Sequence, residues 1–166
     1  MATSTSAVRR TPRARPASRV ARAPKRPTRF VVDTSVWARL ATTPEVVEEL
    51  KKIVELVSPI DLLVCPPVAL EYGFTAPTGK AHATVAAQLE AFGTCDIHPT
   101  QNEVLQIQSR LWNGGLLRAA GAMDTLIAAY AMGNDAAVLH YDRDFEHIAS
   151  VVPGFTHRWI LPRGSI

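Results

Sequence analysis

From Arg29 onward the chain alternates short apolar runs, rich in β-branched residues, with longer amphipathic segments. This alternation is typical of βα units and of a parallel sheet. The pattern predicts five strands, at Phe30–Val32, Leu62–Cys65, Cys95–Ile97, Ala137–His140 and Thr156–Ile160. The helical spacing of apolar residues predicts helices over Pro44–Val57, Pro67–Phe74, Lys80–Phe92, Gln101–Trp112, Ala122–Met132 and Phe145–Ser150. We therefore expect an α/β fold.

Residues 1–28 differ from the rest, because they are rich in Ala, Arg, Pro, Ser and Thr and have almost no large apolar side chains. Such a segment cannot bury enough surface to fold, so we expect a disordered tail followed by one domain over residues 29–166. Nine of the 18 basic residues lie between Arg9 and Arg29, which leaves nine basic against 15 acidic residues from Phe30 onward, a formal charge of −6. We interpret the tail as non-essential and take an RNA-attracting arm as the second interpretation. Two other origins remain open: an organelle transit peptide, or translation from an upstream start codon.

The remaining composition is that of one ordinary domain, since 47% of the 166 residues are apolar. Cys65 and Cys95 lie in apolar surroundings without a metal-binding spacing and are expected to be free core thiols. No apolar run reaches the ~18 residues of a membrane span, and the N-terminus lacks the apolar stretch of a secretory signal. We expect a cytoplasmic protein with no membrane contact.

Several acidic residues fall where a parallel sheet places its ligands, at the carboxyl ends of strands. Asp33 follows the first strand directly, and Glu71 lies in the otherwise apolar helix after the second strand. Asp124 lies one turn into the most apolar helix. Asp142 and Asp144 follow the fourth strand. We expect these acids, distant in sequence, to lie together.

Most of these acids also have an ordinary structural interpretation. Asp33 is as well suited to cap the next helix, and Asp124 to complement a helix dipole. Asp144 is the better candidate for the N-cap of the helix at Phe145–Ser150. Glu71 has the weakest alternative, because carboxylates seldom lie on an apolar helix face. The coincidence of all of them is the stronger evidence.

A cluster of carboxylates is stable only if it is protonated or binds metal, because two of them repel by about 4 kcal/mol at about 4 Å. Mg²⁺, or Mn²⁺ in its place, suits such oxygen ligands. A cation also lets an acidic domain bind a polyanion such as RNA.

Together these residues resemble the PIN-domain nucleases, and among them the VapC-type toxins of bacterial toxin–antitoxin pairs. The resemblance covers about Phe30 to Pro162 and rests on Val-Val-Asp-Thr-Ser-Val, the isolated Glu71, Gly-Ala-Met-Asp-Thr-Leu-Ile-Ala-Ala and Leu-His-Tyr-Asp-Arg-Asp-Phe-Glu-His-Ile-Ala. It implies a three-layer α/β/α sandwich with a central parallel sheet and Mg²⁺-dependent cleavage of RNA. The chain departs from the pattern in its basic extension and at Thr125, where an apolar residue is usual.

The resemblance also implies roles for the acids, with metal-site positions at Asp33, Glu71, Asp124 and Asp142 and an auxiliary one at Asp144. Of these, Asp33, Asp124 and Asp142 are expected to hold one or two ions, while Glu71 positions water or ligates an ion. Arg118 and Arg143 are candidates for RNA phosphate contacts, although surface ion pairs suit them equally. Thr34 or Ser35 is a candidate hydrogen-bond donor to a site carboxylate, with helix capping as the favoured role.

A toxin of this kind implies an antitoxin partner. We therefore expect RNA as the substrate, the antitoxin as the protein partner, and either a homodimer or a toxin–antitoxin hetero-oligomer as the assembly. An Arg of the antitoxin would satisfy the carboxylates in place of the metal. Trp37, Leu40 and Tyr72 are candidates for the groove that binds it, although core packing is favoured for Trp37.

Other enzyme classes lack their motifs. The sequence has no Gly-x-Ser-x-Gly, Walker loop or Gly-x-Gly-x-x-Gly, which argues against nucleophilic triads and nucleotide cofactors. The five histidines lack a matched nucleophile and are interpreted as ordinary surface or core residues. One alternative remains, a non-catalytic or housekeeping RNA-binding or RNA-processing module of the same fold.

Overall fold

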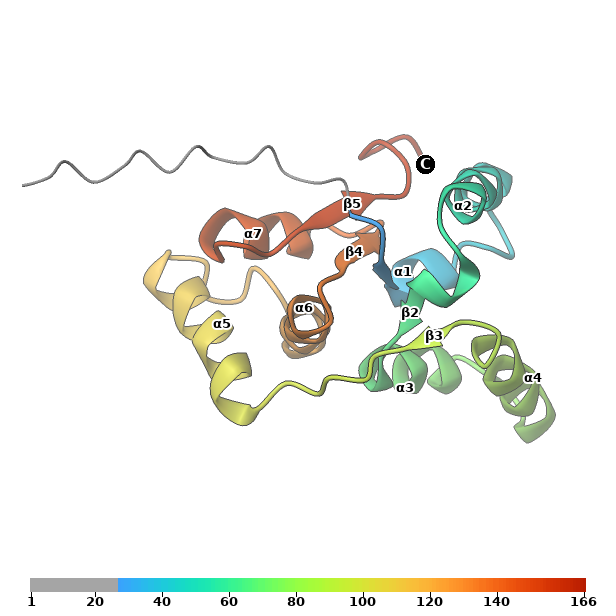
Figure 1. The fold of residues 1–166 in the computed structure, drawn as a ribbon, viewed down its shortest axis with the longest axis horizontal. Coiled ribbons are helices and arrows are strands. Elements are labelled where there is room, and N and C mark those ends of the chain that lie inside the picture. The colour runs from blue at the N-terminus through green and yellow to red at the C-terminus, as the bar shows by residue number, and fades with distance from the viewer. Residues whose placement is uncertain (1–26) are drawn as a thin grey trace, which may run out of the picture.

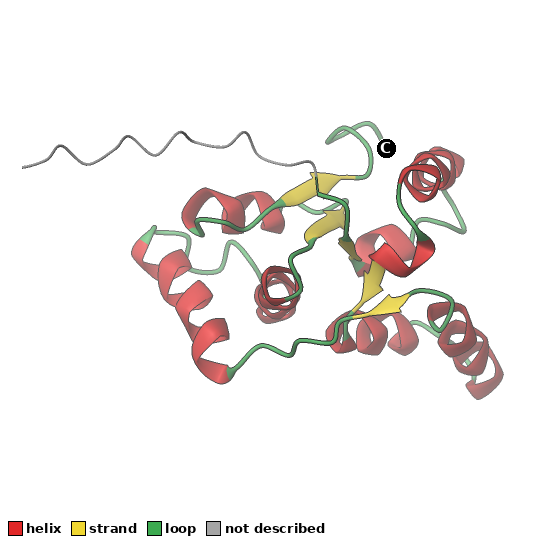
Figure 2. Cartoon of the chain, in the orientation of Figure 1, coloured by secondary structure: helices red, strands yellow, loops and turns green. Residues whose placement is uncertain are grey.

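The centre of the domain is a five-stranded sheet in which every strand is parallel to its neighbours. We describe a computed structural model that covers residues 27–166, so nearly all of the predicted tail lies outside it. The strands are β1 (Phe30–Val32), β2 (Leu62–Val64), β3 (Gly93–Thr94), β4 (Ala137–His140) and β5 (His157–Trp159). Their order is β3-β2-β1-β4-β5, which confirms the predicted α/β class. Strand β1 is therefore central, between β2 and β4 (Figure 2).

Helices cover the sheet on both sides, as Figure 1 shows, with α6 and α7 on one side and α2 on the other. This arrangement agrees with the expected three-layer sandwich. The helices are α1 (Thr34–Trp37), α2 (Pro44–Leu56), the 3₁₀ helix η1 (Pro59–Asp61), α3 (Pro66–Phe74), α4 (Gly79–Leu89), α5 (Gln101–Asn113), α6 (Ala122–Gly133) and α7 (Asp144–Val151).

The core lies around the central strands, where all residues of β1, β2 and β4 are buried. Strands covered on both faces form continuous apolar runs, which is why these segments do not alternate with polar residues. Helix α6 contacts both β1 and β4 and buries Ile127 and Ala128 completely. In the described part of the chain, no helix is both long and apolar enough to cross a membrane.

The main error of the sequence-based prediction is the third strand, which was placed at Cys95–Ile97 but pairs only at Gly93–Thr94. Both backbone groups of Ile97 bond instead to the buried side chain of Asn134, at 3.1 Å and 2.8 Å. The side chain of Asn134 thereby takes the place that a neighbouring strand would have at Ile97. The short helices α1 and η1 were not predicted, and α4 ends at Leu89 rather than at Phe92.

Candidate functional site

Asp33 lies at the carboxyl end of β1, with only 4% of its surface exposed. Its backbone N–H donates to Leu139 O of β4 at 2.9 Å, and its Oδ2 accepts from Ser35 N at 2.8 Å. Asp33 is therefore the N-cap of α1, so the capping role is real. Burial, assisted by the nearby charge of Glu71, raises the pKa of Asp33 despite its hydrogen bonds to Ser35.

Glu71 is joined to the start of α1 through Thr34, whose Oγ1 donates to Glu71 Oε2 at 2.9 Å. Thr34 therefore bonds a candidate site carboxylate, as one of the two sequence interpretations had it. The favoured capping role was wrong for both hydroxyls, because Asp33 caps α1 and Ser35 Oγ accepts from Tyr141 N. These bonds tie the chain after β1 to α3 and to the loop after β4.

Asp124 is held at the start of α6 by Gly121, whose backbone N–H donates to Asp124 Oδ2 at 2.9 Å. A Cβ at Gly121 would lie 2.8 Å from the same oxygen, so any larger residue there would force the Asp124 carboxylate to shift. The Gly121 carbonyl accepts from the buried Thr125 hydroxyl at 2.8 Å. That bond accounts for a polar residue where the family pattern has an apolar one.

The pKa of Asp124 reflects the charges of three other predicted acids. Burial, which is the largest cause, and the charges of Asp144, Asp33 and Asp142 together raise its pKa to about 6, against the hydrogen bond from Gly121. The pKa of Asp144 is also raised, by burial and then by Asp142. Since Glu71 acts on Asp33 in the same way, all five predicted acids influence at least one other member.

Of the two acids after β4, it is Asp142 and not Asp144 that bonds the start of α7. Asp142 Oδ1 accepts from Asp144 N at 3.1 Å, whereas Asp144 is the first residue of α7 and does not cap it. The expectation that Asp144 is the N-cap was therefore wrong. The residue two positions earlier satisfies the free N–H, as Asx turns do.

None of the five acids forms an ion pair within residues 27–166. The same residues contain no group of three His, Cys, Asp or Glu side chains placed closely enough to hold a metal ion as they stand. The donors nevertheless fit a hard divalent cation in kind and charge, because all five are carboxylates and none of them forms an ion pair with a described residue.

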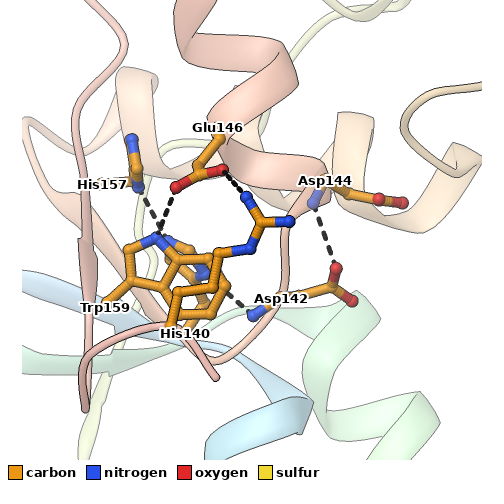
Figure 3. Close-up of polar contacts among 7 residues, drawn as sticks. His140, Asp142, Asp144, Glu146, His157 and Trp159 are labelled. Carbon is orange, nitrogen blue, oxygen red and sulfur yellow. Dashed lines mark hydrogen bonds and ion pairs between the residues drawn. The ribbon is translucent and has the colours of Figure 1, made fainter. Parts of the chain in front are cut away.

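Sequence reasoning missed His140, the last residue of β4, which is completely buried behind Asp142. Its Nδ1 accepts from Asp142 N at 3.0 Å, and its Nε2 lies 2.8 Å from His157 Nδ1 (Figure 3). Burial, together with His157, lowers the pKa of His140 to about 3, so the ring is neutral at physiological pH. Only its position two residues before an acid could have drawn attention to it.

The two candidate RNA contacts, Arg118 and Arg143, are exposed and form no ion pair with any described residue. Both remain predictions. Among the groove candidates, Trp37 belongs to the core, because it is 4% exposed and its Nε1 donates to Val32 O. Leu40 and Tyr72 are half-buried and also pack against the core.

A pocket of about 630 Å³ lies elsewhere, between α3, α4 and the β2–β3 edge. Its lining is mainly apolar and includes Cys65 and Cys95, which are buried free thiols as expected. It contains none of the five acids. The carboxylate cluster is therefore the candidate chemical centre, because a catalytic site is defined by its reactive groups rather than by the volume of a cavity.

Known structures share this fold. The DNA-bound VapBC complex from Salmonella typhimurium contains a chain that matches with a TM-score of 0.64 at 20% identity, over 80% of this chain and 98% of that one. A chain of FitAcB from Neisseria gonorrhoeae matches with a TM-score of 0.58 at 19% identity, over 77% and 95%. At such identities the likeness establishes the fold.

The sequence itself matches the model of the PIN domain over residues 30–151. The chain belongs to the PIN domain family, which confirms the resemblance found in the sequence. Among its relatives are two proteins of Mycobacterium tuberculosis. Ribonuclease VapC21 is 33% identical over 129 residues, covering 75% of this chain and 88% of the relative. Ribonuclease VapC18 is 29% identical over 140 residues, covering 82% and 98%.

Proposed function

We propose that this protein is a Mg²⁺-dependent endoribonuclease that acts as the toxin of a toxin–antitoxin pair. The observation that carries the proposal is the group of five carboxylates that influence one another's pKa and form no ion pair among the described residues. Membership of the PIN family and the ribonuclease relatives support RNA as the substrate. The alternative, a non-catalytic module, predicts the same fold but does not explain why these carboxylates lie where their charges raise one another's pKa.

In this proposal Asp33, Asp124 and Asp142 hold the metal, with Mn²⁺ as a possible substitute. When bound, the ion supplies Lewis-acid stabilisation of phosphate charge and lowers the pKa of a water molecule. Glu71, oriented by Thr34, accepts a proton from the attacking water or adds a ligand. Asp144 adds negative charge that strengthens cation binding, and Arg118 and Arg143 contact RNA phosphates beside the acids.

The test is incubation of the purified chain with total RNA, with and without Mg²⁺, followed by mapping of fragment ends. Asp33→Asn should abolish cleavage while preserving the fold, because the amide oxygen can still accept from Ser35 N. Asp135→Asn is the matched control, since Asp135 is exposed and its φ of 51° suits asparagine. Full cleavage in EDTA, or an active Asp33→Asn variant, would refute the metal mechanism.

We further propose that an antitoxin protein covers the acids in a toxin–antitoxin hetero-oligomer. Leu70 and Phe74 on α3 flank Glu71 and are 64% and 89% exposed, so an apolar partner segment has a surface beside the carboxylates. The chains of similar fold belong to VapBC and FitAcB, which supports a protein partner.

Expression of the gene alone and together with its upstream neighbour tests this partner. Toxicity relieved by the neighbour, with co-purification of a small protein, is the expected result. Equal growth of both strains, without a co-purifying protein, would contradict the antitoxin partner and leave only the nuclease proposal.

A further inference from the structure

Two imidazoles in nitrogen-to-nitrogen contact lie directly behind the candidate metal ligand Asp142. His140 ends β4, and His157 begins the neighbouring edge strand β5. His140 Nδ1 is 3.0 Å from Asp142 N, and His140 Nε2 is 2.8 Å from His157 Nδ1. Figure 3 shows the resulting chain of contacts from β5 through β4 to the loop that carries Asp142.

The protons in this chain have one arrangement that satisfies every partner. A backbone N–H only donates, so the Nδ1 of His140 that faces Asp142 must carry a lone pair. A neutral ring then has its proton on Nε2, which donates to His157 Nδ1. His157 thereby selects the tautomer of His140 that accepts from Asp142.

The ring of His140 is also confined sideways. The aromatic rings of Phe145 and Trp159 lie 4.8 Å and 4.9 Å from it, between ring centroids. Trp159 Nε1 donates to Glu146 Oε1 of α7 at 3.0 Å. The imidazole is thus fixed by packing as well as by its hydrogen bonds, as a group that orients another residue must be.

We infer that His140 is a positioning residue for the metal centre, which holds the Asp142 backbone while His157 holds the His140 ring. Asp142 is then fixed at two points, by its N–H on His140 and by its Oδ1, which accepts from Asp144 N. This leaves Oδ2 as the oxygen free of a hydrogen bond among the described residues. The inference rests on the proposed function, because it concerns the ligand geometry of that site.

Two variants of His140 separate the bonds. In His140→Asn the amide oxygen occupies the position of Nδ1 and still accepts from Asp142 N, but the contact with His157 is lost. In His140→Gln the amide reaches toward His157, but the acceptor for Asp142 N is lost. Both replace an aromatic ring by a smaller amide, so their effects on core packing are matched.

The readout is the affinity of the metal-free full chain for Mn²⁺, measured by calorimetry, together with urea unfolding. Loss of a hydrogen bond behind a ligand weakens metal binding by about 10- to 100-fold. We expect this loss in His140→Gln and recovery of most of the affinity in His140→Asn. RNA cleavage should follow with a lower kcat and a nearly unchanged KM, because substrate contacts are not altered.

Equal Mn²⁺ affinities of the two variants would overturn the inference, since a purely structural role destabilises both alike. Asp142→Asn separates this outcome from failure of the proposed function. If Asp142→Asn weakens binding while His140→Gln does not, only the positioning role falls. If Asp142→Asn has no effect, the site itself is wrong. His82→Gln, at an exposed histidine, is the control.

If the His140 variants do not fold, variants of His157 test the same inference. His157 is half-buried and lies on an edge strand, so its replacement disturbs the core less. His157→Asn retains an acceptor for His140 Nε2–H, whereas His157→Leu removes it. Weaker Mn²⁺ binding in His157→Leu than in His157→Asn supports the inference, and equal binding overturns it.

Discussion

Replacement of Asp124 by Asn should stabilise the metal-free protein, although it removes a metal ligand. Burial and three neighbouring carboxylates raise the pKa of Asp124 from 3.8 to about 6. Such a shift corresponds to about 3 kcal/mol, at about 1.4 kcal/mol per pKa unit. Asp124 is only partly buried, so solvent screening reduces this to about 1–2 kcal/mol. The amide of Asn retains an oxygen that accepts from Gly121 N–H.

The pH dependence follows from the direction of the shift. The native state binds the proton more tightly than the unfolded state, so ionisation of Asp124 costs stability as the pH rises. This cost is absent well below 3.8, grows as the pH rises to about 6, and is complete above that value. The advantage of Asp124→Asn should therefore be present at neutral pH and lost in acid.

Urea unfolding in EDTA, at about pH 7.5 and about pH 4, measures this advantage directly. Asp135→Asn is the control for removal of one exposed acid. Equal stability of Asp124→Asn and wild type near pH 7.5, or a gain that persists near pH 4, would refute the electrostatic reasoning. Mg²⁺ should reverse the order, because a ligand stabilises the form that binds it better.

Two further predictions concern the placement of Asp124 and the tail. Gly121→Ala should lower cleavage by about 100-fold, because the new Cβ displaces the Asp124 carboxylate and ligand misplacement of about 1 Å has effects of that size. Gly79→Ala, where a Cβ meets nothing within 4 Å, should cleave normally; equal activity of both variants would contradict the prediction. Deletion of residues 1–28 should leave unfolding and cleavage unchanged, and a loss at low salt with a flatter salt dependence would identify an RNA arm instead.

The sequence predicted most accurately the strands that are buried on both faces. Strands β1 and β4 have the predicted bounds, because each is a short apolar run covered on both faces. The acids after them were found for the same reason, since a polar residue directly after such a run marks the carboxyl edge of the sheet. The four-residue helix α1 is too short to show helical periodicity.

The parts that were missed depend on contacts between distant residues. The displaced strand β3 results from Asn134, which lies 37 positions from Ile97 and bonds both of its backbone groups. The inferred positioning role of His140 depends on His157, which lies 17 positions away on another strand. Neither Asn134 nor His140 has a local sequence pattern that distinguishes it from an ordinary core residue. Only the tertiary contacts of these side chains show what they bond to.

The donors that orient the acids explain why the cluster keeps its negative charge. Asp33, Asp124 and Asp142 each accept from a backbone N–H, and Glu71 accepts from a hydroxyl. Neutral donors fix the direction of a carboxylate without cancelling its charge, whereas a guanidinium would do both. The described part of the chain thus combines oriented oxygens with uncompensated repulsion. A divalent cation relieves that repulsion directly, and an arginine of a protein partner would compete for the same oxygens.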